Sequence, residues 1–296
     1  MAKRVRRLGA LVLSIDDPSP ERYAEVFRQR FNRHKRADIA IRLSYGTEGL
    51  IEFISRETRS DRGRPFIEGR IAKFQYIEPN TRWFDAITRE EIPDEVGKQY
   101  LPPEGKKHHY QTLTFRFYIN EHTIVSELKN SYGTISIGQL EKLFEGVLNP
   151  EGTDETITIS SLKDKNAVEA IIQTPNLRKL TVTYVKPNPA STKQQHVRRV
   201  MEETRTKQIS TTYTAASPAE GINAQAIRAD LEATIEYGYI EANGVNESGV
   251  AVTKTTKSSP LQKPYEYDSD DGSHETLGDH MDDFIRTSRR PDDNND

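Results

Sequence analysis

The feature that most constrains the fold is a series of strand and helix patterns between residues 112 and 185. Strands are indicated by alternating apolar and polar residues or by β-branched runs, and helices by an apolar period near 3.6 residues. The six segments cover, in chain order, residues 112–120, 122–128, 137–148, 155–160, 164–173 and 177–185. Their order of strand, strand, helix, strand, helix and strand is typical of a ferredoxin-like ββαβαβ unit, with helices on one face of a mostly antiparallel sheet.

The first hundred residues predict a β-rich lobe with one basic helix. Residues 8–15 have a strand pattern, and residues 20–34 predict a helix because Tyr23, Phe27 and Phe31 recur every four positions. Proline at the start of this segment also suits the first turn of a helix. The patterns that follow are strands at residues 39–43, 50–55 and 66–77 and an exposed, arginine-rich loop at residues 56–64.

We therefore expect an α+β protein with two lobes, built from mostly antiparallel sheets with helices packed on one face. The β-rich lobe is assigned to residues 1–108 and an α/β lobe to residues 109–260. Beyond residue 258 the chain becomes rich in Pro, Tyr, Asp and Ser, and this composition predicts disorder. Residues 261–296 are accordingly expected to form a disordered acidic tail.

Composition excludes several functional classes. The chain has no cysteine, which rules out disulfides, thiolate metal sites and a cysteine nucleophile. No P-loop, Rossmann glycine pattern, nucleophile elbow or kinase signature occurs, so we expect neither a cofactor nor a bound metal ion. The longest apolar stretch, residues 8–13, is far shorter than the roughly 20 residues of a membrane span, and no signal-peptide cleavage site follows it. The prediction is a cytoplasmic protein without a membrane partner.

Charge is strongly segregated along the chain. The formal net charge is −3, but residues 266–296 contain eleven acidic residues and three arginines, which leaves residues 1–265 with a net charge of +5. Residues 1–42 alone carry eleven Lys or Arg against five Asp or Glu. A basic body with an acidic end favours a polyanionic partner, above all nucleic acid. A solvated basic surface with a solubilising tail explains the same pattern and stays open as an alternative.

Arginine outnumbers lysine wherever the basic charge gathers. On a helical projection Arg22, Arg33 and Arg36 fall within about 60° of one another. Arginine suits phosphate because its planar guanidinium donates two parallel hydrogen bonds, and phosphate contacts do not read base sequence. The predicted function is non-catalytic, sequence-independent binding of nucleic acid; DNA is favoured as the partner, and RNA stays open as an alternative. The residues predicted to bind it are Arg4, Arg6, Arg7, Arg22, Arg33, Arg36, Arg56, Arg59, Arg62 and Arg64.

The acidic end suggests autoinhibition. Its carboxylates are interleaved with aromatic residues, and we hypothesise that they fold back over the basic body as a phosphate mimic. A tethered segment has a high local concentration, although salt screens its longer-range attraction. The acidic residues in this hypothesis are Asp268, Asp270, Asp271, Glu275, Asp279, Asp282 and Asp283.

Two other functions stay open. Asp94 followed by Glu127 and Lys129 has the residue order of a metal-dependent nuclease core, in which two carboxylates hold a divalent metal and the lysine orients water. Asp94 lies in a segment rich in proline and glycine, which is a poor setting because metal ligands need neighbouring strands to fix them. The other alternative is a protein–protein regulatory module, which would neither bind nor cut nucleic acid.

Short motifs spread along the chain carry a family resemblance. They include RLGAL at residues 7–11, SPERY at 19–23, WFD at 83–85, LRKL at 177–180, KPNP at 186–189 and YGYIEA at 237–242. Together they resemble a bacterial family known as a domain of unknown function, which implies a bacterial or prophage-borne protein of phage-defence neighbourhoods. The layout of residues 113–186 is also similar to that of the lambda exclusion protein RexA, a dimer that binds DNA without sequence preference. These resemblances imply a homodimer and a partner protein from a defence operon.

Overall fold

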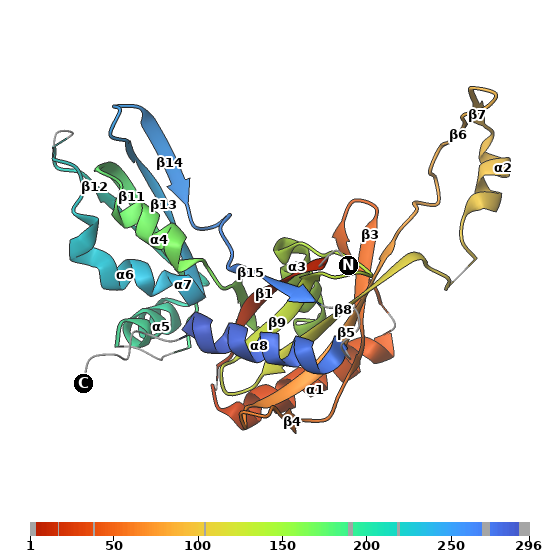
Figure 1. The fold of residues 1–296 in the computed structure, drawn as a ribbon, viewed down its shortest axis with the longest axis horizontal. Coiled ribbons are helices and arrows are strands. Elements are labelled where there is room, and N and C mark those ends of the chain that lie inside the picture. Colours follow the sequence, from red (N-terminus) through yellow and green to blue (C-terminus); the bar gives the residue numbers. More distant parts are fainter. Residues whose placement is uncertain are drawn as a thin grey trace.

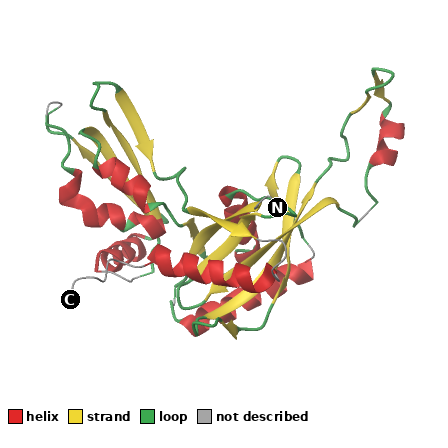
Figure 2. Cartoon of the chain, in the orientation of Figure 1, coloured by secondary structure: helices red, strands yellow, loops and turns green. Residues whose placement is uncertain are grey.

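The computed structural model describes residues 4–16, 18–37, 39–103, 105–188, 192–217, 220–267 and 273–289. Helices and strands are both abundant in these ranges, and the described strand pairs are antiparallel (Figures 1 and 2). The predicted α+β class with mostly antiparallel sheets is therefore confirmed.

A nine-stranded sheet forms the centre of the molecule. Its main order is β10-β1-β9-β8-β5-β3-β2, while β15 also pairs with β1 and β4 with β5. The strands are β1 (Arg4–Ser14), β2 (Ile41–Ser44), β3 (Thr47–Ile54), β4 (Thr58–Arg59), β5 (Pro65–Gln75), β8 (His108–Tyr118), β9 (Thr123–Lys129), β10 (Thr158–Ser161) and β15 (Gln262–Tyr267). β8 pairs with β5 and with β9, so this sheet contains strands from both sides of the predicted boundary between residues 108 and 109.

Two helices, α1 (Pro20–Ala37) and α3 (Ile137–Leu148), cover one face of the central sheet. The rings of Phe27 and Phe117 are stacked at 4.7 Å between centroids, and those of Phe115 and Phe144 meet edge to face at 5.1 Å. α3 begins with a capping box at Ser136, which satisfies backbone donors of its first turn. The aromatic stripe predicted for the first helix is thus the core-facing side of α1.

The opposite face of the central sheet is covered by α8 (Ser273–Arg289), which crosses it in Figure 1. Leu277, Met281, Phe284 and Ile285 are buried in the same core as β1, β8 and β9 side chains. The prediction of a disordered tail is therefore corrected for β15 and α8, while residues 268–272 and 290–296 lie outside the described residues. Apolar residues at i, i+4, i+7 and i+8 form one helical face, and its burial stabilises a segment whose composition is acidic.

A second, four-stranded sheet has the order β12-β11-β13-β14. Its strands are β11 (Asn176–Val185), β12 (Gln208–Thr214), β13 (Gly238–Val245) and β14 (Ala251–Thr255). The helical segments around it are α4 (Lys165–Ile172), α5 (Thr192–Thr204), η2 (Ala224–Ile227), α6 (Arg228–Glu232) and α7 (Thr234–Tyr237). The predicted ββαβαβ order occurs as β8, β9, α3, β10, α4 and β11. These elements do not share one sheet, however, because β10 pairs with β1 whereas β11 pairs with β12 and β13.

A buried hydrogen-bonded cluster joins the two sheets. Tyr23 on α1 donates to Asn188 Oδ1 at 2.7 Å, and Asn188 Nδ2 donates to Tyr237 Oη at 2.8 Å. The same Asn188 amide lies 2.7 Å from the carbonyl of Leu13, and the Tyr23 ring stacks on His122 at 4.0 Å. Buried polar groups that find partners rigidify a junction, so the position of the second sheet is set by specific side chains.

An arm projects from the central sheet between β5 and β8 (Figure 1). It contains β6 (Trp83–Asp85), β7 (Glu90–Ile92), α2 (Asp94–Gly97) and η1 (Lys98–Tyr100). Trp83 packs on Tyr100 with 5.4 Å between ring centroids, but the neighbouring Phe84 is exposed and Ile87 is 93% exposed. None of the helices that the structure describes is long and apolar enough to cross a bilayer.

Candidate nucleic-acid interface

The arginine loop, residues 56–64, lies against α8. Arg62 Nη1 is 2.7 Å from the Asp283 carboxylate, and Arg64 Nη1 donates to the backbone carbonyl of Asp282 at 3.1 Å. Arg64 is also 3.2 Å from Glu121. Two of the four predicted arginines in this loop therefore contact the acidic helix or its neighbouring turn.

The other two arginines of the loop face solvent. Arg56 is exposed, and Arg59 is exposed while donating to the Gly63 carbonyl at 2.9 Å within the loop. Glu57 pairs with Arg28 of α1 at 3.4 Å, which fixes the loop beside that helix. The exposed guanidiniums keep donors available to an external anion.

The arginines predicted on the first helix face a different segment. Arg22 is 3.2 Å from Glu155, and Arg33 donates to the carbonyl of Glu151 at 2.7 Å. Arg36 is exposed in the last turn of α1. Arg22 and Arg33 thus face residues 151–155 and not the arginine loop.

The arginines of β1 are separated from one another. Arg6 is buried and pairs with Glu127 at 3.2 Å, and that carboxylate also accepts from Tyr265 at 3.0 Å. In this fold the Arg6 side chain is buried and cannot contact a polyanion. Arg7 is exposed and donates to Gln262 at 3.3 Å, whereas the Arg4 side chain lies outside the described part of the chain. The ten predicted arginines thus do not form one continuous surface.

The anchor of α8 is a buried polar network that the sequence analysis missed. Tyr118 Oη donates to Asp282 Oδ1 at 2.5 Å, and Arg116 Nη1 is 3.8 Å from the same carboxylate oxygen. Arg116 also donates to Glu68 at 2.9 Å. Burial raises the pKa of Tyr118, with Asp282 adding to the effect, so its hydroxyl stays a protonated donor.

The acidic residues of the autoinhibition hypothesis have different positions. Asp282 is buried, Asp283 contacts Arg62, and Asp279 is exposed on α8. The side chains of Asp268, Asp270, Asp271 and Glu275 lie outside the described residues. The contact between α8 and the arginine loop is therefore carried by residues 282 and 283.

The residues of the nuclease alternative lie on separate parts of the molecule. Asp94 begins α2 at the far end of the arm, while Glu127 is in β9 of the central sheet (Figure 1). Glu127 is buried and engaged by Arg6, Tyr265, the Thr114 amide at 3.0 Å and Asn130 at 2.9 Å. Among the described residues, no group of three His, Asp or Glu side chains is placed to hold a metal ion.

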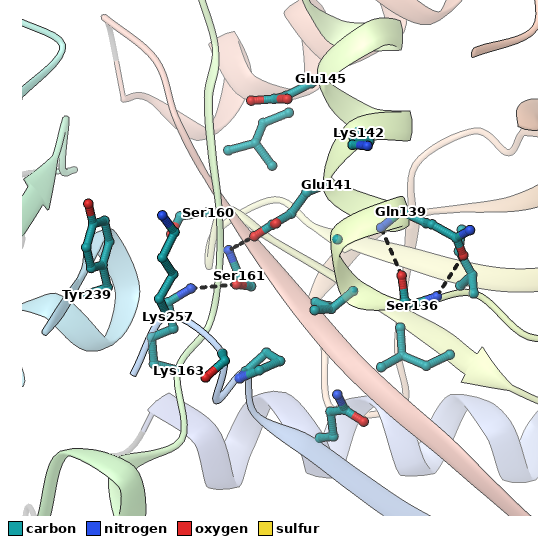
Figure 3. A pocket seen from close by; sticks show the side chains of 18 of the residues that line it. Ser136, Gln139, Glu141, Lys142, Glu145, Ser160, Ser161, Lys163, Tyr239 and Lys257 are labelled. Atoms are coloured by element: carbon teal, nitrogen blue, oxygen red, sulfur yellow. Dashed lines mark hydrogen bonds between the residues drawn. The ribbon is translucent and has the colours of Figure 1, made fainter. Parts of the chain in front are cut away.

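A second basic feature lies between the two sheets and was not predicted. This basic cleft has a volume of about 980 Å³ and lies between the start of α3, the end of β10 and the start of β13 (Figure 3). It is lined by five cationic side chains, Arg7, Lys129, Lys142, Lys163 and Lys257, and by two carboxylates, Glu141 and Glu145. The lysines come from segments far apart in the sequence, so no local pattern indicated them.

Comparison with known proteins identifies the family of this chain. None of the curated proteins matches the chain. The family profile described as a domain of unknown function (DUF4747) matches residues 7–282, nearly the whole chain, and this confirms the resemblance to such a family. The match includes both sheets, the arginine loop, the basic cleft and α8 as far as Asp282. The chain therefore belongs to the family described as a domain of unknown function, DUF4747.

Proposed function

We propose that this protein binds nucleic acid without sequence preference through exposed arginines of the loop at residues 56–64 and of α1, and that α8 competes for part of that surface. The observation that carries the proposal is the Asp283 carboxylate, which lies 2.7 Å from Arg62 among the loop arginines. A carboxylate at this distance occupies the position that a phosphate oxygen takes in an arginine–phosphate contact. The proposed interface has two separate parts, which are Arg56, Arg59 and Arg62 of the loop and Arg33 and Arg36 of α1.

The Arg62–Asp283 contact is suited to exchange. Both side chains are nearly half exposed, at 46% and 47%, and ion pairs of this kind are worth about 0 to 1 kcal/mol. α8 itself is held by its buried apolar face and by Asp282, which do not depend on Arg62. A phosphate can thus displace the Asp283 carboxylate while α8 stays docked. Asp283 therefore weakens DNA binding without blocking it.

The first test measures binding of the full chain to labelled duplex DNA by fluorescence anisotropy across a salt series. Replacing Arg56, Arg59 and Arg62 together by glutamine is expected to weaken binding and to reduce the salt slope by about 1.8, since Arg56 and Arg59 each lose a phosphate contact that contributes about 0.9, whereas Arg62 is occupied by Asp283 in the native chain. Arg82→Gln is the matched control, because Arg82 is exposed but lies on the arm and pairs with Glu91. An unchanged slope in the triple variant rules out this loop as the interface.

The competition by α8 has its own test. Asp283→Asn removes the carboxylate partner of Arg62 and also that of Arg286, which lies 3.2 Å from Asp283, so DNA affinity at low salt is expected to rise and the salt slope to steepen by about 0.9 for each arginine that then contacts a phosphate. Glu247→Gln provides the same change of net charge at an exposed turn of the second sheet. Equal increases in the two variants would mean that overall charge, and not the local contact, limits binding.

We further propose that the protein is a homodimer that uses its arm. Phe84, Ile87 and Tyr100 are exposed large apolar side chains on this projecting segment, and contiguous exposed apolar surface is typical of protein interfaces. Sedimentation velocity is expected to show a dimer that becomes monomeric in the Phe84→Ser, Ile87→Ser double variant. A monomeric native chain contradicts the dimer and turns attention to a different protein partner for the arm.

The proposed biological setting is prophage or phage-defence biology in the cytoplasm. The support is the family resemblance together with the RexA-like layout, both of which imply a defence role. Expression of the chain in bacteria is expected to lower phage plaquing, and the Arg56, Arg59 and Arg62 triple variant is expected to lose that protection. Protection that survives the triple variant would separate the defence role from DNA binding.

A further inference from the structure

The basic cleft contains a buried lysine whose positive charge has few polar partners. Lys163 is only 6% exposed, and among the residues that the structure describes its ammonium has one hydrogen-bond acceptor, Ser161 Oγ at 2.6 Å. Burial lowers the pKa of Lys163; the Glu141 carboxylate offsets part of this effect, and Lys257 adds to it. A buried charge that lacks full partners is costly, and an anion in the cleft would remove that cost.

Lys163 and Lys257 lie close together in the basic cleft, facing Glu141 (Figure 3). Glu141 does not neutralise them fully, because its carboxylate carries one negative charge against two ammonium groups and also accepts the backbone N–H of Ser161 at 2.8 Å. Lys257 is exposed and rests over the Tyr239 ring, 5.0 Å from its centroid. The pair therefore presents two ammonium groups to whatever enters the cleft.

The beginning of α3 adds a favourable field for an anion. Ile137 and Gly138 of its first turn line the cleft, and a Cβ added at Gly138 would meet no atom within 4 Å. The first N–H groups of a helix carry a partial positive charge and attract phosphate. Here this feature supplements the lysines, which carry the argument.

The size and lining of the cleft indicate the class of ligand. Ligand pockets of proteins span about 300 to 1,000 Å³, so about 980 Å³ is ample for a nucleotide-sized molecule. Beside the charged groups, the lining contains apolar side chains that suit an organic ring or chain: Leu128, Ile135, Ile137, Ile159 and Val185. A volume of about 980 Å³ matches a single nucleotide and not a continuous strand, and this favours a small phosphate ester over nucleic acid as the occupant.

We propose that the basic cleft binds a small phosphate ester of nucleotide size, with Lys163 and Lys257 as its phosphate-binding residues. This site lies apart from the arginine loop and does not depend on the proposed nucleic-acid interface. The two lysines come from the segment after β10 and the segment after β14. A ligand that contacts both lysines would therefore link the β10 edge of the central sheet to the second sheet.

The test uses the full chain with ATP and with inorganic pyrophosphate, measured by isothermal titration calorimetry and by the shift of the melting temperature. ATP is expected to bind and to raise the melting temperature, and pyrophosphate is expected to bind more weakly because it cannot use the apolar lining. Lys163→Met and Lys257→Met are each expected to weaken both ligands at least tenfold. The matched control is Lys207→Met, since Lys207 is exposed on the second lobe and does not line the cleft.

Because Lys257 is exposed, its variant keeps the test valid if the Lys163 variant folds poorly. The Arg56, Arg59 and Arg62 triple glutamine variant should bind ATP as the native chain does, which distinguishes failure here from failure of the nucleic-acid proposal. The proposal is overturned if neither ATP nor pyrophosphate binds, or if Lys257→Met binds them as tightly as the native chain. It is also overturned if duplex DNA displaces ATP and loses affinity in the lysine variants but not in the arginine variant.

Discussion

Replacing Tyr118 by phenylalanine tests how α8 is held on the central sheet. The Tyr118 hydroxyl donates to the buried Asp282 carboxylate at 2.5 Å, and phenylalanine keeps the ring while removing this donor. A hydrogen bond to a charged group is worth about 1.5 to 3 kcal/mol. Arg116, at 3.8 Å, still offers Asp282 partial compensation, so we expect a loss near 1.5 to 2 kcal/mol in the free energy of unfolding.

Urea unfolding followed by far-UV circular dichroism measures this loss. Tyr110→Phe is a matched control on the same strand, because Tyr110 also donates to a carboxylate, Glu52, but is exposed. Its free energy of unfolding is expected to change by no more than about 0.5 kcal/mol. A double-mutant cycle with Asp282→Asn should give a coupling energy of about 1 kcal/mol or more for the buried pair. Equal effects of the two tyrosine variants, or a coupling energy near zero, would refute the assigned role of this contact.

Three further variants test the packing of the central sheet. Phe284→Ala on α8 is expected to cost about 3 to 5 kcal/mol in urea unfolding, since the ring is fully buried, and an unchanged stability would mean that α8 does not pack there. Gly69→Ala places a Cβ against the buried Phe115 ring and 2.8 Å from the Phe53 carbonyl, and it is expected to cost about 1 to 3 kcal/mol; a neutral result would contradict this close packing. Burial lowers the pKa of His34, so the native stability should fall as the pH drops below about 6.5, where the unfolded imidazole takes up a proton. His34→Leu should flatten that dependence between pH 7.5 and 5.5 in the same assay.

Local patterns predicted the elements of this chain better than their assembly. The alternation in residues 112–185 located the helices and strands, because periodicity reports which face of each element is buried. It could not assign β10 and β11 to different sheets, since their partners lie in β1, β12 and β13, at large sequence separations.

The acidic end shows why composition misled at α8. Acidic residues outnumber arginines by eleven to three in residues 266–296, yet Leu277, Met281, Phe284 and Ile285 repeat with the spacing of one helical face. Four apolar residues on one side of a helix are enough to dock it on an apolar sheet face. Composition averages over both faces of a helix and therefore hides this signal.

The candidate sites show the same limit, because residues close in sequence could be predicted as a group and residues brought together by the fold could not. The loop at residues 56–64 was predicted because its arginines are close in sequence, and the structure keeps Arg56 and Arg59 exposed there. Arg6 could not be separated from them by sequence alone, because its partner Glu127 is 121 residues away. The basic cleft was missed for the same reason, since Lys163 and Lys257 are brought together only by the tertiary fold.

The motifs behind the family resemblance lie mainly in the scaffold of the fold. Tyr23, Asn188 and Tyr237 each belong to one of these motifs and meet in the hydrogen-bonded cluster between the sheets, so part of the resemblance reflects the scaffold. Arg7 and Tyr239 also belong to such motifs, and both line the basic cleft. The loop at residues 56–64 belongs to none of them. Lys163 and Lys257, the proposed phosphate-binding residues, belong to none of them either. The motifs therefore describe the scaffold and part of the cleft wall, and the choice between the two proposed sites depends on the variants of Lys257 and of Arg56, Arg59 and Arg62.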